Sequence, residues 1–405
     1  MAVPVIVFVL VYLGMGLGGV PGLALDRTGI ALLGLIALIG TESMTLADAA
    51  SAIDTPTIAL LFALMIISAQ FEQSGFYNWV ALRITRAAHS PKSLLAAIII
   101  ATGLLSAVLT NDVVVFALTP LLCTGILALR LDVRPYLMGL AAAANAGSAA
   151  TLIGNPQNIL IGQAGKLDFW RYILFAVPPT LAALGIIFVI ILMTWRLEPA
   201  RISGQPEPIQ LDRYQLGKAI IAVTALVGLF FTPLPREVSA LAIAGILLLS
   251  RRLSSRDMIG AVDWHLLLMF TCLFGVTQAF SRTGLAQQGL AWLGQQGLYP
   301  DHISLMAPVT MVASNTIGNV PFVVLFIKLL PDLGAGPLFG LAMLSTFAGN
   351  LLLTGSICNI IVAERAAIQG ARLSFADFAR SGIPITVLSM AATIGWLMFT
   401  GLLAL

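Results

Sequence analysis

The chain has few charged residues, and this scarcity excludes whole classes of protein. Only 10% of its 405 residues are charged, and 59% are hydrophobic, whereas about a quarter of the residues of a soluble globular protein are charged. Apolar runs of about 20 residues recur along the chain, the length needed to cross about 30 Å of hydrocarbon. The sequence therefore predicts a polytopic membrane protein rather than a soluble one.

Cysteine and histidine are also scarce. The three cysteines, Cys123, Cys272 and Cys358, lie within apolar runs without CxxC spacing, which indicates packing rather than a disulfide or metal set. The three histidines are scattered, and no basic cluster points to nucleic acid. With no Walker A motif and no nucleophile–base set, we expect neither an enzyme nor a resident cofactor.

The apolar runs predict ten spans and two further segments. The first run lacks the basic start and cleavage site of a signal peptide, so we expect it to be a retained span. Two segments, about 91–130 and 301–331, are apolar, then polar and small, then apolar again. The ten spans are expected at about 4–20, 28–41, 56–73, 134–163 (interrupted), 169–195, 217–233, 237–250, 264–281, 335–363 (interrupted) and 381–404.

The two halves of the chain resemble each other. Asp54–Gly75 aligns with Asp263–Gly284 without a gap, and each segment begins with an Asp that we expect to be a helix N-cap. Three further matches follow in the same order. These are Thr110-Asn111-Asp112 with Ser314-Asn315-Thr316, Pro120 with Pro321, and Gly154–Asn158 with Gly355–Asn359.

These matches predict a domain organisation. Residues 1–195 form the first repeat, with scaffold helices at about 1–90 and 169–195 and a transport hairpin and broken helix at about 91–165. A cytoplasmic linker follows at 196–215. Residues 216–405 form the second repeat, with its hairpin and broken helix at about 301–370.

Charge distribution predicts the topology. If 91–130 and 301–331 are re-entrant hairpins, each half crosses the membrane five times and the second half is inverted relative to the first. Of the 21 Lys and Arg residues, 16 then fall on one side and 5 on the other, which makes the first side cytoplasmic. The fold class expected is thus an all-α polytopic membrane protein with two inverted-topology repeats, each with a re-entrant hairpin and a broken helix. Both termini face outward.

Interrupted helices at membrane depth suggest a binding site. Backbone leaves a helix there only where protein or a water-lined cavity satisfies its polar groups. Gly154-Asn155-Pro156 interrupts the first run and Thr354-Gly355-Ser356 interrupts the second. Exposed carbonyls with Asn and Ser oxygens suit sodium, while exposed amide ends suit an anion.

Two stretches carry a family resemblance. LTNDVVVFALTPLL and NAGSAATLIGNPQNILIG are similar to the ion transporter superfamily, which includes arsenite permeases, NhaD-type sodium/proton antiporters and divalent anion/sodium symporters. The resemblance implies a scaffold domain, a mobile transport domain moving as an elevator, and usually a homodimer. The symporters have Ser-Asn-Thr at both hairpin tips, where it helps to bind sodium. Ser314-Asn315-Thr316 retains that motif, whereas Thr110-Asn111-Asp112 is closer to the acidic tip of the arsenite permeases.

Asp112 is the residue expected to couple transport to a gradient, because an ionisable group at membrane depth is costly and usually functional. The alternative is an Asp at a helix end near the interface. No Lys or Arg is expected in the site. For the coupling ion, a proton or a sodium ion held at the hairpin tips, we expect Thr110, Asn111, Asp112, Ser314, Asn315 and Thr316. For the substrate we expect Ser148, Thr151, Gly154, Asn155, Asn158, Asn350, Thr354, Gly355, Ser356 and Asn359.

The function that the sequence favours is secondary active transport of a small anion or oxyanion across the cytoplasmic membrane, coupled to a proton or sodium gradient. A sodium/proton antiporter and an arsenite-type efflux permease working with a soluble ATPase remain alternatives, and a channel is a third. The expected partners are the transported ion or small molecule, the lipid bilayer and a second copy of the chain.

Overall fold

The computed structural model describes residues 2–17, 22–87, 89–197 and 211–402. Residues 18–20 of the first predicted span and 198–210 of the predicted linker lie outside this part of the chain. The described part of the first half contains ten α-helices. These are α1 (Ala2–Leu17), α2 (Arg27–Gly40), α3 (Leu46–Ala52), α4 (Thr55–Gln73), α5 (Phe76–Ala87), α6 (Pro91–Val108), α7 (Asn111–Ala128), α8 (Arg134–Ser148), α9 (Pro156–Ala164) and α10 (Phe169–Thr194).

The second half has the same order of elements, with one short 3₁₀ turn added. Its elements are α11 (Arg213–Leu229), α12 (Arg236–Leu248), α13 (Ser255–Gly260), α14 (Trp264–Ser281), α15 (Leu285–Gln295), α16 (Ile303–Thr316), α17 (Asn319–Leu329), α18 (Ala335–Ala348), η1 (Leu353–Gly355), α19 (Ile357–Ile368) and α20 (Phe375–Phe399). Each element from α1 to α10 thus has a counterpart from α11 to α20.

The predicted helix starts are confirmed. Asp54 accepts a hydrogen bond from the backbone N–H of Thr57 at 2.9 Å, and Asp263 accepts one from Leu266 at 2.9 Å. Both are N-caps, which satisfy backbone donors that the first turn of a helix leaves free.

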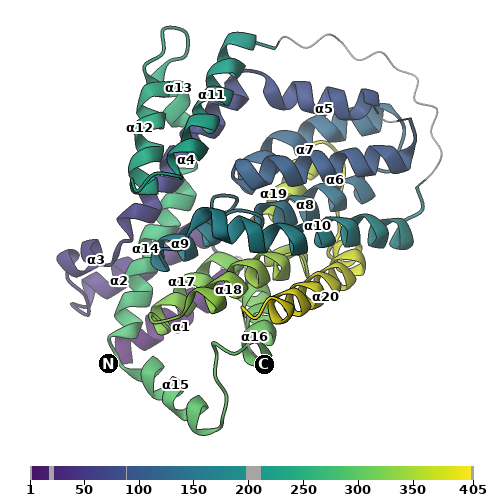
Figure 1. Cartoon of the computed structure of the whole chain (residues 1–405). Coiled ribbons are helices and arrows are strands. Elements are labelled where there is room, and N and C mark those ends of the chain that lie inside the picture. Colours follow the sequence, from purple (N-terminus) through teal and green to yellow (C-terminus); the bar gives the residue numbers. More distant parts are fainter. Residues whose placement is uncertain (1, 18–21, 88, 198–210, 403–405) are drawn as a thin grey trace.

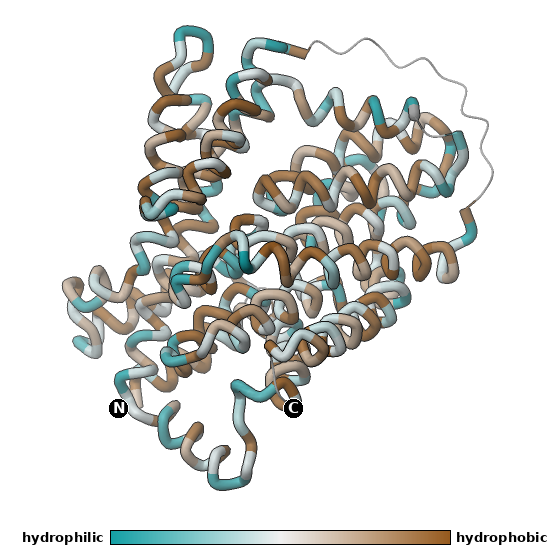
Figure 2. The backbone as a smooth tube through the Cα atoms, viewed as in Figure 1, coloured by the Kyte–Doolittle hydropathy of each residue, from teal (hydrophilic) through white to brown (hydrophobic). Residues whose placement is uncertain are grey.

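The chain is a multi-pass membrane protein by the length and composition of its helices. Within the described ranges, six helices are long and apolar enough to cross a bilayer, namely α4, α6, α7, α10, α14 and α20. Hydrophobic residues predominate along the helices, and many of the hydrophilic residues lie at the connections between them (Figure 2). Helices satisfy most of their backbone groups within their own segment, as a hydrocarbon environment requires.

The two halves interlock rather than stand side by side. Helix α2 packs on α14 of the other half, and its counterpart α12 packs on α4; likewise α7 packs on α19, and α17 packs on α9. Helices α10 and α20 pack against each other (Figure 1). Contacts therefore exchange in pairs between counterparts, as they do when two repeats are related by a two-fold axis.

Both predicted interruptions are present. The span expected at 134–163 is divided into α8 and α9, and the span expected at 335–363 into α18 and α19 with η1 between them. The segments expected at 91–130 and 301–331 are helix pairs, α6–α7 and α16–α17, whose two arms pack together. Their re-entry into the membrane stays a prediction.

Two sequence pairings in the hairpins are wrong. Pro120 is the tenth residue of α7, whereas Pro321 is the third residue of α17. We paired Thr110-Asn111-Asp112 with Ser314-Asn315-Thr316, but α16 continues through Thr316 and the second hairpin turns at Ile317 and Gly318. Gly318 has φ +94°, a left-handed conformation that favours glycine, and this places the turn there. Asn319, the first residue of α17, is therefore the counterpart of Asn111, the first residue of α7.

The short amphipathic helices α5 and α15 differ in their packing. Helix α5 packs on α4, α6 and α7 and buries Tyr77, Val80 and Ala81. Helix α15 packs mainly on α14, leaves Trp292 59% exposed, and projects from the body of the molecule (Figure 1).

Candidate functional site

The first break in the helices is tied together by two asparagines. Asn155 caps α9 by accepting from the Asn158 N–H at 2.8 Å, and its own amide donates to the Ser148 hydroxyl at 2.8 Å. Asn158 donates to the carbonyls of Thr151 at 3.0 Å and Ser148 at 3.3 Å, which the interruption of the helix leaves free. Gly154 is needed here, because a Cβ would overlap the Ser148 and Ser106 carbonyl oxygens.

The tip of the first hairpin is attached to this break. The backbone N–H of Asn111 donates to the Gly154 carbonyl at 2.9 Å, and the Thr151 hydroxyl donates to the Ala107 carbonyl at 2.6 Å. The Asn111 side chain reaches Ser148 at 3.5 Å. The predicted residues of the first half are thus brought together.

The second break repeats this arrangement with different side chains. Asn359 donates to the carbonyls of Gly349 at 2.7 Å and Leu352 at 3.1 Å, as Asn158 does in the first half. Asn315, near the end of α16, donates to the Ala348 carbonyl at 2.8 Å and accepts from the Leu352 N–H at 3.3 Å. Asn315 therefore belongs to the site although it is not at the turn of the hairpin.

A single amide on α8 joins the two breaks. Asn145 donates to the side-chain oxygens of Asn350 at 2.8 Å and Asn359 at 3.0 Å, and it accepts from the Ser356 hydroxyl at 2.9 Å. Its relative exposure is 0%. Most of the predicted asparagine and serine residues of the two halves therefore belong to one connected polar network, bridged by a residue that sequence reasoning did not single out.

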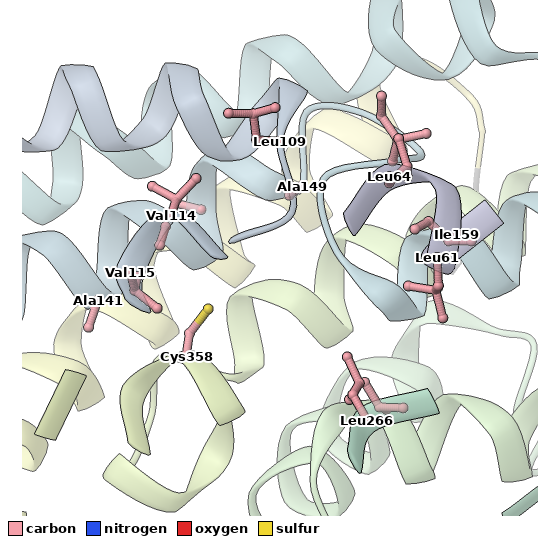
Figure 3. Packing of buried hydrophobic residues seen from close by; sticks show 14 of the residues in the cluster. Leu61, Leu64, Leu109, Val114, Val115, Ala141, Ala149, Ile159, Leu266 and Cys358 are labelled. Atoms are coloured by element: carbon pink, nitrogen blue, oxygen red, sulfur yellow. The ribbon is translucent and has the colours of Figure 1, made fainter. Parts of the chain in front are cut away.

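Asp112 faces the other half of the chain. It is half-buried in the first turn of α7, and the Cys358 thiol on α19 donates to its carboxylate at 3.1 Å. Figure 3 shows Cys358 beside Val114 and Val115 of α7. Within the described part of the chain, no Lys, Arg or His lies within 4 Å of this carboxylate. The charge of Asp112 is thus free to be neutralised by a proton or a bound cation.

Several hydroxyl groups near the hairpin tips are unsatisfied. Ser106 on α6 and its counterpart Ser314 on α16 are both 0% exposed, and neither hydroxyl has a hydrogen-bond partner among the described residues. The same holds for Thr110 at 2% exposure. A buried polar group without a partner destabilises the folded protein by about 1–3 kcal/mol. Each of these oxygens is therefore a candidate for binding a ligand.

The expectation that no Lys or Arg falls in the site is wrong. Arg27, the first residue of α2, donates to the carbonyl of Thr354 in η1 at 3.5 Å. It makes no ion pair with any carboxylate in the ranges described. Sequence reasoning missed it because the contact joins residues 327 positions apart. A half-buried guanidinium thus lies beside the second break.

Two predicted residues lie at the edge of the network. Thr316 is exposed and bonds to the Val312 carbonyl of its own helix, and the Thr354 side chain is exposed as well. Thr346 was missed, although its hydroxyl accepts from Asn155 at 3.1 Å. A lone Asn inside the run of alanines from Ala141 to Ala150 was the available signal for Asn145.

Comparison with known proteins decides the family. Residues 8–338 match the family model described as CitMHS, citrate transporter. The chain belongs to the CitMHS family. This confirms the resemblance to the ion transporter superfamily.

Relatives of this CitMHS member span nearly the same length. It is 28% identical to a 46 kDa membrane protein of Mycobacterium leprae over 90% of each chain. It is 24% identical to the silicon efflux transporter LSI3 of rice (Oryza sativa subsp. japonica) over 92% of each chain. It is also 22% identical to the putative transporter arsB of Dictyostelium discoideum, over 90% of this chain and 86% of that one.

A solved structure shares the fold. The YdaH transporter of Alcanivorax borkumensis aligns with a TM-score of 0.57 at 17% identity, covering 99% of this chain and 98% of that one. The family and these relatives show that the CitMHS member is a membrane transporter of an ion or small molecule.

Proposed function

We propose that the protein is a secondary active transporter of a small anion or oxyanion across the cytoplasmic membrane, coupled to a proton or sodium gradient. The observation that carries the proposal is the joining of both helix breaks and both hairpins into one buried amide network through Asn145. Irregular backbone from the two halves meeting at one place is how many secondary transporters build a substrate site.

Arg27 supports an anionic substrate. Its guanidinium lies at the second break without a carboxylate partner among the described residues. Planar guanidinium groups bind carboxylates and oxyanions through paired hydrogen bonds. Citrate, after which the family model is named, is such an anion. Neutral silicic or arsenous acid would gain less from this charge.

Asp112 and the hydroxyls near the tips support cation coupling. Thr110, Ser106 and Ser314 offer oxygens that no described group occupies, and hydroxyl and carbonyl oxygens are the ligands that hard cations prefer. Asp112 provides a carboxylate that a proton can neutralise.

The proposal includes a mechanism of movement. Segments 91–165 and 301–370 form the transport domain, the remaining helices form the scaffold and a dimer contact, and the transport domain moves as an elevator. The second half is inverted relative to the first, and both termini face outward.

Uptake into proteoliposomes tests this function. Citrate, dicarboxylates, sulfate, silicate and arsenite are offered under imposed proton or sodium gradients, with wild type, Asp112→Asn and the control Asp257→Asn, an exposed carboxyl on α13. We expect a gradient to drive uptake of an anion, and Asp112→Asn alone to abolish it. Coupling that survives in Asp112→Asn would exclude this residue as the proton carrier, and a strict need for sodium together with a working Asp112→Asn variant would make Asp112 structural.

The alternatives give different results in the same assay. Sodium flux against protons without any anion would identify a sodium/proton antiporter. Transport that appears only with a co-purified nucleotidase would identify an ATPase-driven efflux permease. A conductance that does not saturate would identify a channel.

A further inference from the structure

A second pocket lies away from the amide network, between α4, α5, α7 and α19. Its volume is about 180 Å³, and it is lined by Glu72, Tyr77, Asn78, Phe116, Pro120 and Arg365 among others. These residues come from four separate elements, so the pocket is a feature of the tertiary fold. None of them was needed for the transport site described above.

Two opposite charges share this pocket without making contact. Glu72 in the last turn of α4 is near enough to Arg365 on α19 to interact electrostatically, yet the two make no ion pair within 4 Å. Arg365 is held by Phe116, because its guanidinium carbon lies 3.4 Å from the centroid of that ring. This cation–π contact fixes the positive charge on the α7 side. Both charged residues line the same pocket of about 180 Å³.

A buried hydroxyl in the same pocket has no partner. Tyr77 is 3% exposed, and its hydroxyl makes no hydrogen bond with any residue that the structure describes. Asn78, the next residue, adds an exposed amide to the lining. Both groups can donate hydrogen bonds to an anionic oxygen.

From this geometry we propose that the pocket binds the phosphoethanolamine headgroup of a membrane lipid. The phosphate is bound by Arg365, Tyr77 and Asn78, and the ammonium group by Glu72. A simple anion would be repelled by Glu72, and a simple cation by Arg365. A headgroup with both charges satisfies the two residues at once and fills the space between them.

The surroundings favour a lipid over a free solute. Glu72 ends a helix long and apolar enough to cross the bilayer, and the amphipathic helix α5 begins four residues later. Phe116, which lines the pocket, is 42% exposed, and Trp79, which follows Asn78 on α5, is 36% exposed. Amphipathic helices with exposed aromatics are typical of the headgroup region, so acyl chains can lie against these apolar side chains.

Lipid retention in nanodiscs tests the proposal. The full chain is reconstituted with phosphatidylethanolamine, phosphatidylcholine or phosphatidylglycerol, and the lipids retained after release are counted by native mass spectrometry. We expect preferential retention of phosphatidylethanolamine.

Glu72→Gln and Arg365→Gln should each weaken the retention of phosphatidylethanolamine about tenfold, the loss expected for one charge-assisted hydrogen bond. The control Glu364→Gln, exposed on the same helix, should not change it. Equal retention of all three lipids would overturn the proposal.

Two further measurements separate this ligand from its rivals. The double variant Glu72→Arg/Arg365→Glu keeps two opposite charges but reverses their order, whereas the acyl chains fix the direction of a lipid headgroup. Loss of retention supports the lipid, and retention at the wild-type level overturns the proposal, because the two charges then do not orient the headgroup. Stabilisation of the protein by soluble glycerophosphoethanolamine equal to that by the lipid would also overturn the proposal, in favour of a free solute.

Asn78→Ala, a mild change at an exposed position, should weaken the retention of phosphatidylethanolamine even if the charge variants fail to fold.

Discussion

The two halves of the chain build the same backbone arrangement from different side chains. In the first half Asn155 caps α9, and Asn111 is followed by the acidic Asp112. In the second half Ser356 precedes α19 without capping it and donates instead to Asn145, and the counterpart of Asp112 is the apolar Val320. The first half thus carries both the ionisable Asp112 and the bridging amide Asn145, whereas the second half has Val320 and Thr346 at the counterpart positions. The comparison teaches that a repeated fold can keep its backbone arrangement while one copy alone holds the ionisable and bridging side chains.

The largest effect on stability is expected from Asn145→Leu. Leucine has a similar size but makes none of the three hydrogen bonds to Asn350, Asn359 and Ser356, which then lie buried with fewer partners. We expect the protein to lose about 3 kcal/mol or more. The counterpart change Thr346→Val removes every hydrogen bond of that hydroxyl, but it should cost only about 1 kcal/mol, because Asn155 and Asn158 keep other partners in the first break. Thermal unfolding in detergent measures both, and equal losses would show that the two halves are braced alike.

Alanine at the two glycines of the breaks should be the next most damaging change. A Cβ at Gly154 would overlap backbone carbonyl oxygens, whereas one at Gly355 would first meet the Asn315 side chain, which can rotate. We expect Gly154→Ala to cost about 1–3 kcal/mol and Gly355→Ala less. The yield of monodisperse protein and its unfolding temperature provide the measurement. A greater loss for Gly355→Ala would contradict this account.

Removing the unsatisfied hydroxyls should raise stability by up to about 1–3 kcal/mol in the absence of the cation, but it should weaken cation binding. Ser106→Ala and Ser314→Ala each delete an oxygen that has no partner in the described structure. If sodium drives transport, we expect the sodium concentration for half-maximal uptake to rise in each variant. If protons alone drive transport, we expect the dependence of uptake on the proton gradient to remain unchanged. If only one of the two variants responds, the cation site belongs to that half.

The smallest effect is expected at a surface ion pair present in one half only. Arg282 donates to Asp48 at 2.7 Å, whereas the counterparts of these residues are Gln73 and Asp257. The Thr45 hydroxyl and Arg282 hold the pKa of Asp48 at about 2. Because this pKa lies below the value of about 3.9 in an unfolded chain, the pair stabilises the fold above pH 4 and ceases to do so as the pH falls through 2.

Arg282→Gln should therefore lower the unfolding temperature slightly at pH 7 and not at all near pH 2. An exposed pair contributes little at best. Thermal unfolding of the two proteins at both pH values checks this. A difference that grows towards acid would contradict the assignment.

The sequence alone was sufficient to predict the apolar helices, the two helix breaks and most of the residues of the polar network. Asn155, Asn158 and Asn359 stood beside glycines inside apolar runs, and that local signal is a strong one. Asn145 and Arg27 lacked it, because their roles depend on residues 205 to 327 positions away. The second hairpin was misplaced because Ser314-Asn315-Thr316 matched a familiar motif, while the turn depended on the conformation of Gly318.

The interlocking of α2 with α14 and of α4 with α12 also bears on synthesis in the cell. The first half emerges from the ribosome long before its partners exist, and Asn145 has no acceptor until the residues around Asn350 and Asn359 are made. The early helices therefore stay in the bilayer with unpaired side-chain amides until the second half is made, and each unpaired group there is energetically unfavourable. Assembly of this fold is thus expected to be late and concerted, and a chain truncated before α18 should be recognised as unfinished and degraded.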